Sequence, residues 1–187
     1  MNTSAKVGDS RVWRRTRWLV WGGAATLLLL PLVAMQFTRE VNWTGSDFVV
    51  MGALLGIVGI AFEIAVRVAR SHAYVFGAGV AVAAAFLMTW INLAVGIVGN
   101  ENNPANLMFF AVIMVAVVGC LVSWLRPLGM ARAMEAAAAA QAVVAAITLA
   151  IGEGQIFVFT AVFVALWLAS AQLFRMAARE HCNTAAK

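Results

Sequence analysis

Long apolar stretches recur along this chain of 187 residues, and they constrain its fold more than any other feature. They follow one another from Trp18 to Phe174 with only a few polar residues between them. Apolar stretches of about 20 residues can cross the hydrocarbon core of a membrane as helices. Hydrophobic residues make up 64% of the chain and charged residues 11%, whereas a soluble domain has about 25% charged residues. This composition excludes an ordinary soluble enzyme, a disordered tail and a disulfide-rich secreted domain.

The apolar runs and the turn residues between them predict an all-α fold, an integral membrane bundle of six transmembrane helices. The predicted spans are 18–37, 48–69, 74–99, 107–125, 134–152 and 156–174. The connections between them are short, so consecutive helices should be antiparallel neighbours. A basic cytoplasmic segment, 1–17, precedes this transmembrane domain, 18–174, and a cytoplasmic tail, 175–187, follows it.

The positive residues predict the orientation of the six spans. Lys and Arg favour the cytoplasmic side of a membrane. With both termini inside, one of the thirteen Lys and Arg residues, Arg39, lies outside. The other twelve lie inside: Lys6, Arg11, Arg14, Arg15, Arg17, Arg67, Arg70, Arg126, Arg132, Arg175, Arg179 and Lys187. The net charge of +5 therefore indicates topology, and a nucleic-acid partner is not expected.

Span 48–69 contains a buried carboxylate candidate. Gly52, Gly56, Gly59 and Glu63 share one helical face, and small residues at this spacing mark contact faces between membrane helices. Glu63 should therefore face a neighbouring helix, with Arg67 placed at i+4 to pair with it. Three roles are open for Glu63: a structural ion pair with Arg67, a proton- or cation-carrying carboxylate, or a contact to a partner protein.

Two more spans carry an amide among small residues on one face. The sets are Thr89, Asn92, Gly96 and Gly99 in span 74–99, and Gln141, Ala145, Thr148 and Gly152 in span 134–152. An unpaired amide is costly in hydrocarbon, so Asn92 and Gln141 should form hydrogen bonds between helices. The alanine-rich span 134–152 should lie centrally in the bundle.

The outer loop 100–106 holds four asparagines, one carboxylate and a proline. These residues are typical of a turn, and Asn106 takes the position of an N-cap for the span that follows. A second interpretation is an outer polar site formed by Glu101, Asn102 and Asn103. Other outer loops would add oxygen ligands suited to a hard cation; these are Asn42, Asp47 and Glu153.

Motifs for chemistry are missing from the sequence. His72 and His181 lie outside the predicted spans, which disfavours a haem or a histidine metal site inside the membrane. No P-loop, H-E-x-x-H or G-x-S-x-G motif is present. We therefore expect no enzyme activity, no cofactor and no metal.

Two stretches resemble segments of small bacterial polytopic inner-membrane proteins, a family without an established activity. They are the run from Arg39 to Phe48, and Trp90 to Gly96 together with Asn100 to Pro104. They cover about a sixth of the chain, in the outer loops and adjacent helix ends. The resemblance implies a protein of the bacterial cytoplasmic membrane and brings no function with it.

Three function classes are compatible with this sequence. The first is a structural or accessory subunit, or an assembly factor, that acts through helix contacts in the lipid bilayer with a membrane-protein partner or with further copies of itself. The alternative is a small transporter or channel for a proton, a cation or a small solute, which would use buried Glu63 and Asn92. An enzyme that acts at the outer face through Glu101 or Asp47 has the least support.

Overall fold

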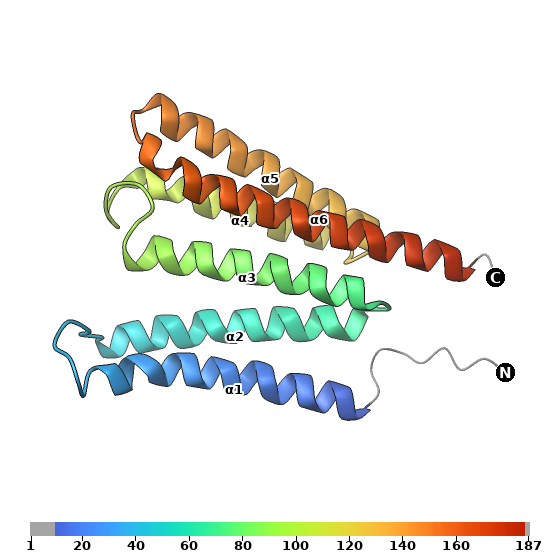
Figure 1. The fold of residues 1–187 in the computed structure, drawn as a ribbon, viewed down its shortest axis with the longest axis horizontal. Coiled ribbons are helices and arrows are strands. Elements are labelled where there is room, and N and C mark those ends of the chain that lie inside the picture. The colour runs from blue at the N-terminus through green and yellow to red at the C-terminus, as the bar shows by residue number, and fades with distance from the viewer. Residues whose placement is uncertain (1–9, 186–187) are drawn as a thin grey trace. The chain divides into compact units, whose positions relative to one another are not determined.

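The computed structural model describes residues 10–185, which form six α-helices and no β-strand (Figure 1). The α-helices are α1 (Ser10–Ala34), α2 (Gly45–Val68), α3 (His72–Ala94), α4 (Leu107–Val122), α5 (Pro127–Ala150) and α6 (Phe157–Ala185). Two short 3₁₀ helices, η1 (Pro104–Asn106) and η2 (Gly154–Ile156), precede α4 and α6. The prediction of an all-α fold is confirmed.

Five segments of the described chain are long and apolar enough to cross a membrane. They are α2, α3, the stretch Pro104–Val122 that contains α4, α5, and the part of α6 up to Glu180. The apolar part of α1, Val20–Ala34, is shorter. These lengths support a membrane-embedded helical protein with five or six spans.

Helices α3 and α4 end earlier than the hydropathy pattern predicted. Helix α3 ends at Ala94 and not at residue 99, because Gly96 and Gly99 have φ angles of +72° and +67°. Glycine adopts this left-handed conformation without strain, but a right-handed helix cannot contain it. Helix α4 likewise ends before residue 125, because Trp124 and Leu125 have φ angles of 52° and 58°. Gly96 and Gly99 therefore lie in a loop and not on a helical face with Asn92.

Other helices extend beyond the predicted spans. Helix α5 begins at Pro127 and not at residue 134, and α6 continues to Ala185 and not only to residue 174. Helix α1 begins at Ser10, before the predicted residue 18, and ends at Ala34. The predictions followed hydropathy, whereas alanine and arginine continue a helix well beyond its apolar part. Pro127 suits the first turn of α5, where its missing N–H is not needed.

The described chain forms two compact units, one ending at Arg67 and one beginning at Val68. Helices α1 and α2 form a hairpin in the first unit (Figure 1). Their contacts follow one antiparallel register: a Cβ atom on Gly59 would lie 3.4 Å from the indole of Trp21, and one on Gly52 would lie 3.9 Å from Leu28. The glycines thus give the large side chains of α1 room to pack.

The second unit is a bundle of the other four helices. Helix α5 packs against α4 and α6, and α6 also packs against α3. Large side chains fill the interior, and the most deeply buried are Met88, Phe109, Met134, Trp167 and Phe174. The Ser170 hydroxyl of α6 donates a 2.8 Å hydrogen bond to the carbonyl of Gly77 on α3. The bundle therefore has a packed apolar core with polar contacts between helices.

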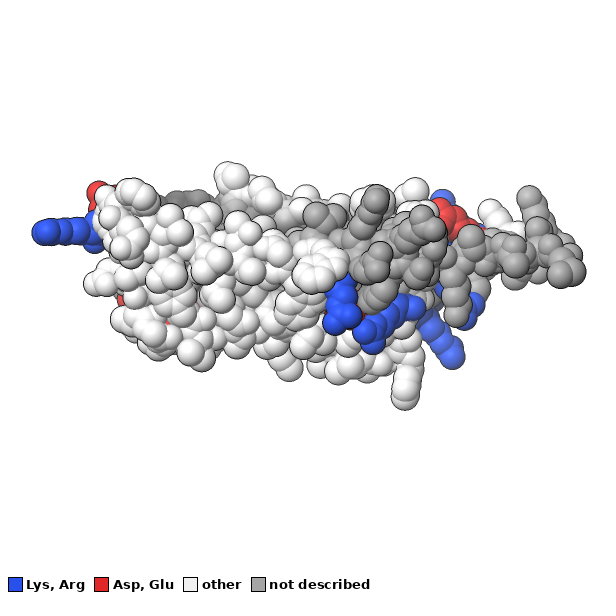
Figure 2. Space-filling model, turned by 90° about the horizontal axis from the view of Figure 1, so that it is seen from below, with Lys and Arg blue, Asp and Glu red and all other residues white. Residues whose placement is uncertain are grey.

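Many large apolar side chains are exposed as well as buried. Val122 of α4 is 74% exposed and Val158 of α6 is 72% exposed. On the face drawn in Figure 2, a broad band has no charged side chain, and Lys and Arg lie toward its two ends. An apolar outer surface is favourable next to lipid chains, which are as apolar as the side chains themselves.

Candidate functional site

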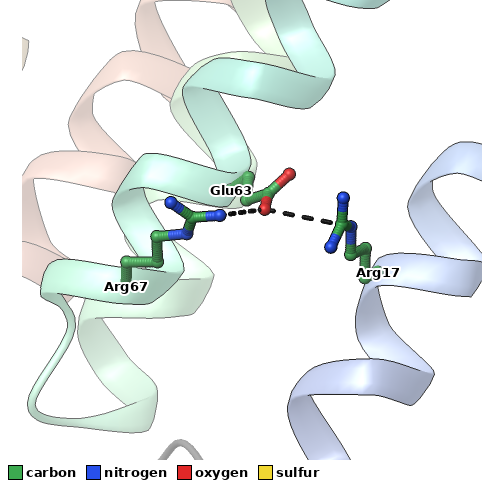
Figure 3. Close-up of polar contacts among 3 residues, drawn as sticks. All are labelled: Arg17, Glu63 and Arg67. Atoms are coloured by element: carbon green, nitrogen blue, oxygen red, sulfur yellow. Dashed lines mark hydrogen bonds and ion pairs between the residues drawn. The ribbon is translucent and has the colours of Figure 1, made fainter.

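The first candidate group lies in the α1–α2 hairpin, toward the C-terminal end of α2 (Figure 3). Nη2 of Arg67 lies 2.5 Å from Oε1 of Glu63, and Nε of Arg17 on α1 lies 3.9 Å from the same oxygen. The Glu63 side chain is 14% exposed. The carboxylate thus has a charge-assisted hydrogen bond within its own helix and a second positive charge on the neighbouring helix.

The small-residue face of α2 points toward α1. Gly52, Gly59 and Glu63 all contact α1 in the antiparallel register described above. Gly56 lies on the same face but has open space around it, since no atom beyond its own stretch of helix lies within 4 Å of the position that a Cβ atom would take there. The neighbour that this face contacts is therefore the preceding helix, joined to α2 by a short loop.

The second candidate group is the loop between α3 and α4, which a single buried asparagine holds in place. Asn106 is 4% exposed. Its Oδ1 accepts hydrogen bonds from the backbone N–H groups of Ile97 and Val98 at 3.0 and 2.8 Å, and its Nδ2 donates to the carbonyl of Asn100 at 2.6 Å. The carbonyl of Asn106 accepts a 2.9 Å hydrogen bond from Nδ2 of Asn92. One side chain thus satisfies several backbone groups of the loop.

The prediction that Asn106 takes the N-cap position of α4 is confirmed, but its side chain does not cap the helix. The side chain makes no hydrogen bond to the first turn of α4. The amide is short and can satisfy either the helix or the loop. A hydrogen bond to the buried N–H groups of Ile97 and Val98 stabilises the structure more than a cap on α4 would, because an unsatisfied buried donor is costly.

The predicted outer-loop residues mainly organise local backbone. Oδ1 of Asn103 accepts a 2.9 Å hydrogen bond from the N–H of Ala105 and so caps η1. Nδ2 of Asn102 donates to Oε1 of Glu101 at 3.4 Å, and both residues are exposed. This pair is exposed on the surface of the loop.

Asp47 has a comparable local role at the start of α2. Its Oδ2 accepts hydrogen bonds from the backbone N–H and the hydroxyl of Thr44, at 2.7 and 2.8 Å. A side chain that reaches back to the residue before the helix is one half of a capping box. Among residues 10–185, no group of three or more His, Cys, Asp and Glu side chains is placed to hold a metal ion.

The third candidate lies in the interior of the four-helix unit. Gln141 on α5 and Trp167 on α6 are 0% and 1% exposed. Neither amide atom of Gln141, nor Nε1 of Trp167, has a hydrogen-bond partner among the described residues. The prediction that Gln141 bonds to another helix is therefore wrong. The hydroxyls of Thr148 and Thr160, which are also buried, donate instead to carbonyls of their own segments.

Sequence reasoning missed several contacts between helices, among them an ion pair between α5 and α6. Nη2 of Arg175 on α6 lies 2.6 Å from Oε1 of Glu135 on α5. The signal was present: Glu135 begins one predicted span and Arg175 follows the next, so antiparallel neighbours bring the two charges to the same depth. The pairing of Glu135 with Arg175 could be recognised only once the structure showed that α5 and α6 are in contact.

The fold and these contacts define a class, a helical protein with five segments able to cross a membrane and with a few polar side chains buried among its helices. No protein-family model, curated protein or solved structure matches the chain.

Proposed function

We propose that the chain is an integral membrane protein with six spans and both termini on the cytoplasmic side of a bacterial membrane. The five long apolar segments and the apolar part of α1 support the number of spans. The distribution of Lys and Arg, twelve on one side against Arg39 on the other, supports the orientation. The bacterial origin rests on the resemblance of the outer loops to bacterial inner-membrane proteins.

Thiol labelling in intact cells tests this topology. Cys182 lies in the C-terminal tail and is exposed, so a membrane-impermeant maleimide should label it only after the membrane is permeabilised. In a Cys120→Ala background, a cysteine placed by Glu101→Cys should be labelled in intact cells. Labelling of Cys182 from outside would overturn the orientation, and labelling of both from one side would overturn the three spans between residues 101 and 182.

Within this topology, we propose that the protein is a structural or accessory subunit, or an assembly factor, that acts through its helix faces. One observation carries this proposal: Glu63 and Asn92, the two side chains that the transporter alternative would use, are engaged in internal contacts. Glu63 pairs with Arg67 and Arg17, and Asn92 donates to the backbone of Asn106. The remaining outer surface of the helices is broadly apolar, as a helix-binding subunit requires.

Native mass spectrometry of the protein, purified gently from its own membrane, tests the accessory role. We expect one membrane protein, or further copies of this chain, at a fixed stoichiometry. Photo-crosslinkers at exposed positions then locate the contact, with adducts expected on one contiguous helix face only. Suitable positions are Leu29 and Leu30 on α1, Val117 and Val118 on α4, and Val158 and Val162 on α6. A monomer without adducts at any of these positions would contradict the proposal.

The substitution Glu63→Gln separates an ion-pair role from proton carriage. We expect the free energy of unfolding to fall by up to about 1 kcal/mol, because the arginines are 58% and 63% exposed and solvent screens such pairs. Proton flux into proteoliposomes should be at the same background level for the wild-type protein and the Glu63→Gln variant. Stability is measured by SDS titration of mixed micelles, with Glu40→Gln at an exposed position as control. Loss of a measurable flux at unchanged stability would favour the transporter.

Transport of a small solute is the second candidate function, and the unpartnered groups of Gln141 and Trp167 are the observation that favours it. Buried polar groups without protein partners are sites where a water or a passing solute can bind. If these groups have only a structural role, Gln141→Met should leave the stability unchanged or raise it by about 1 kcal/mol, because an unsatisfied amide is removed at similar volume. A lower stability, or a loss of solute uptake, would favour a bound polar species.

A further inference from the structure

One end of the four-helix unit contains a groove with a volume of about 480 Å³. Three chain segments form its walls: the connection before α3, the connection between α4 and α5, and the last turns of α6. Arg70 and Ser71 come from the first, Trp124 and Arg126 from the second, and Cys182 from the third. Binding sites for small molecules have volumes of roughly 300–1,000 Å³, so the groove has room for a phosphate with its glycerol.

The groove is positively charged. Arg70 and Arg126 both line it and are exposed, and none of its lining residues is acidic. Neither guanidinium forms an ion pair with any residue in the described part of the chain. Two unneutralised guanidinium groups at one groove favour an anion, and their planar donor pattern matches phosphate oxygens in particular.

The wall between α4 and α5 is held in an unusual conformation. Trp124 and Leu125 both have left-handed φ angles, which costs a non-glycine residue about 1–3 kcal/mol and requires support from its surroundings. The Tyr74 hydroxyl provides it by donating a 2.8 Å hydrogen bond to the carbonyl of Leu125. Tyr74 is 2% exposed and packs edge-on against Phe174, at a centroid distance of 5.0 Å. The core thus positions this wall.

Trp124 indicates whether the groove suits the phosphate of a lipid or a free phosphate ion. Its side chain is 84% exposed although it lines the groove, and tryptophan at the end of a span is typical of the headgroup level of a bilayer. Apolar residues, including Val68 and Leu128, form much of the remaining wall. An apolar wall next to two arginines suits a phosphate that carries acyl chains better than it suits a free anion.

We propose that this groove binds the phosphate headgroup of an anionic phospholipid from the cytoplasmic leaflet, with Arg70 and Arg126 as the phosphate ligands. The inference rests on the proposed membrane topology, which places this end of the unit at the cytoplasmic surface. Basic pockets between membrane helices on that side are suited to anionic headgroups. The first turn of α5, which has no side-chain cap at Arg126, adds a partial positive charge at the groove.

Native mass spectrometry with added lipid tests the proposal. The purified protein is titrated with phosphatidylglycerol and with phosphatidylcholine of the same acyl chains. Each arginine near an anionic lipid contributes about fivefold in affinity, so Arg70→Gln combined with Arg126→Gln should weaken phosphatidylglycerol binding about thirtyfold. Arg132→Gln combined with Arg179→Gln removes the same charge from exposed arginines outside the groove and should retain the binding.

A second measurement uses the unmodified groove. Cys182 lines it and is exposed, so bound lipid should slow its reaction with a soluble maleimide in phosphatidylglycerol but not in phosphatidylcholine. Equal binding of the two lipids, or equal maleimide rates, would overturn the proposal even if thiol labelling supports the topology. Displacement of the lipid by inorganic phosphate at equal concentration would overturn it in favour of a soluble anion.

Discussion

Replacing Asn106 by alanine should destabilise the four-helix unit by roughly 2–5 kcal/mol. The substitution removes the acceptor for the backbone N–H groups of Ile97 and Val98, which are 8% and 0% exposed residues. A buried donor left without a partner costs about 1–3 kcal/mol, and two are created together. The hydrogen bond from Nδ2 to the carbonyl of Asn100 is lost as well. In the Asn106→Ala variant, we expect the loop between α3 and α4 to open first on unfolding.

The measurement is an SDS titration of mixed micelles, with the helical signal followed by circular dichroism. Asn102→Ala is the matched control, since this asparagine is exposed in the same loop and its side chain donates a long hydrogen bond of 3.4 Å to the exposed Glu101. It should change the stability by less than about 0.5 kcal/mol. Equal effects of Asn106→Ala and Asn102→Ala would show that the buried amide does not hold the loop.

Replacing Gly119 by alanine should separate α4 from α5 and cost about 1–3 kcal/mol, the usual range for overpacking. A Cβ atom on Gly119 would lie 2.6 Å from Cβ of Ala133 and 3.1 Å from its Cα. Carbon atoms in contact lie about 3.5–4.0 Å apart, so no side-chain rotation can relieve the clash. The backbones of the two helices must move.

Two variants make this prediction specific. Gly56→Ala introduces the same methyl group into α2 with no atom beyond its own stretch of helix within 4 Å, so it should be neutral or stabilising by up to about 1 kcal/mol from helix propensity. Adding Ala133→Gly to Gly119→Ala removes the opposing methyl group and should restore part of the lost stability. Additive losses in the double variant would contradict a direct clash between these two positions.

Properties encoded within one helix could be predicted from the sequence. The apolar runs predicted an all-α protein, and the i, i+4 spacing of Glu63 and Arg67 predicted the ion pair that the structure contains. The spacing of Gly52 and Gly59 predicted a face in contact with another helix, which is α1. Each of these depends only on the regular geometry of a single helix.

Helix ends and hydrogen-bond partners were harder to predict. Hydropathy continues through Gly96 and Gly99, so the end of α3 depends on backbone conformations that the loop requires. The side chain of Asn106 can bond either to the first turn of α4 or to the backbone of the preceding loop. Burial of the loop favours the loop, whose Ile97 and Val98 N–H groups donate to it. Gln141 was expected to have a partner, but its amide has none among the described residues, and the buried hydroxyls of Thr148 and Thr160 bond within their own segments.

The sequence by itself determined that the chain is helical and apolar along most of its length, because segment length and composition are local properties. Only the tertiary structure decided which apolar faces are buried, since Val112 and Val122 of the same helix are 1% and 74% exposed. It also brought Arg70, Trp124 and Arg126 to one groove. In helices that are apolar on every side, periodicity does not distinguish a face toward protein from a face toward lipid, because both environments favour the same side chains.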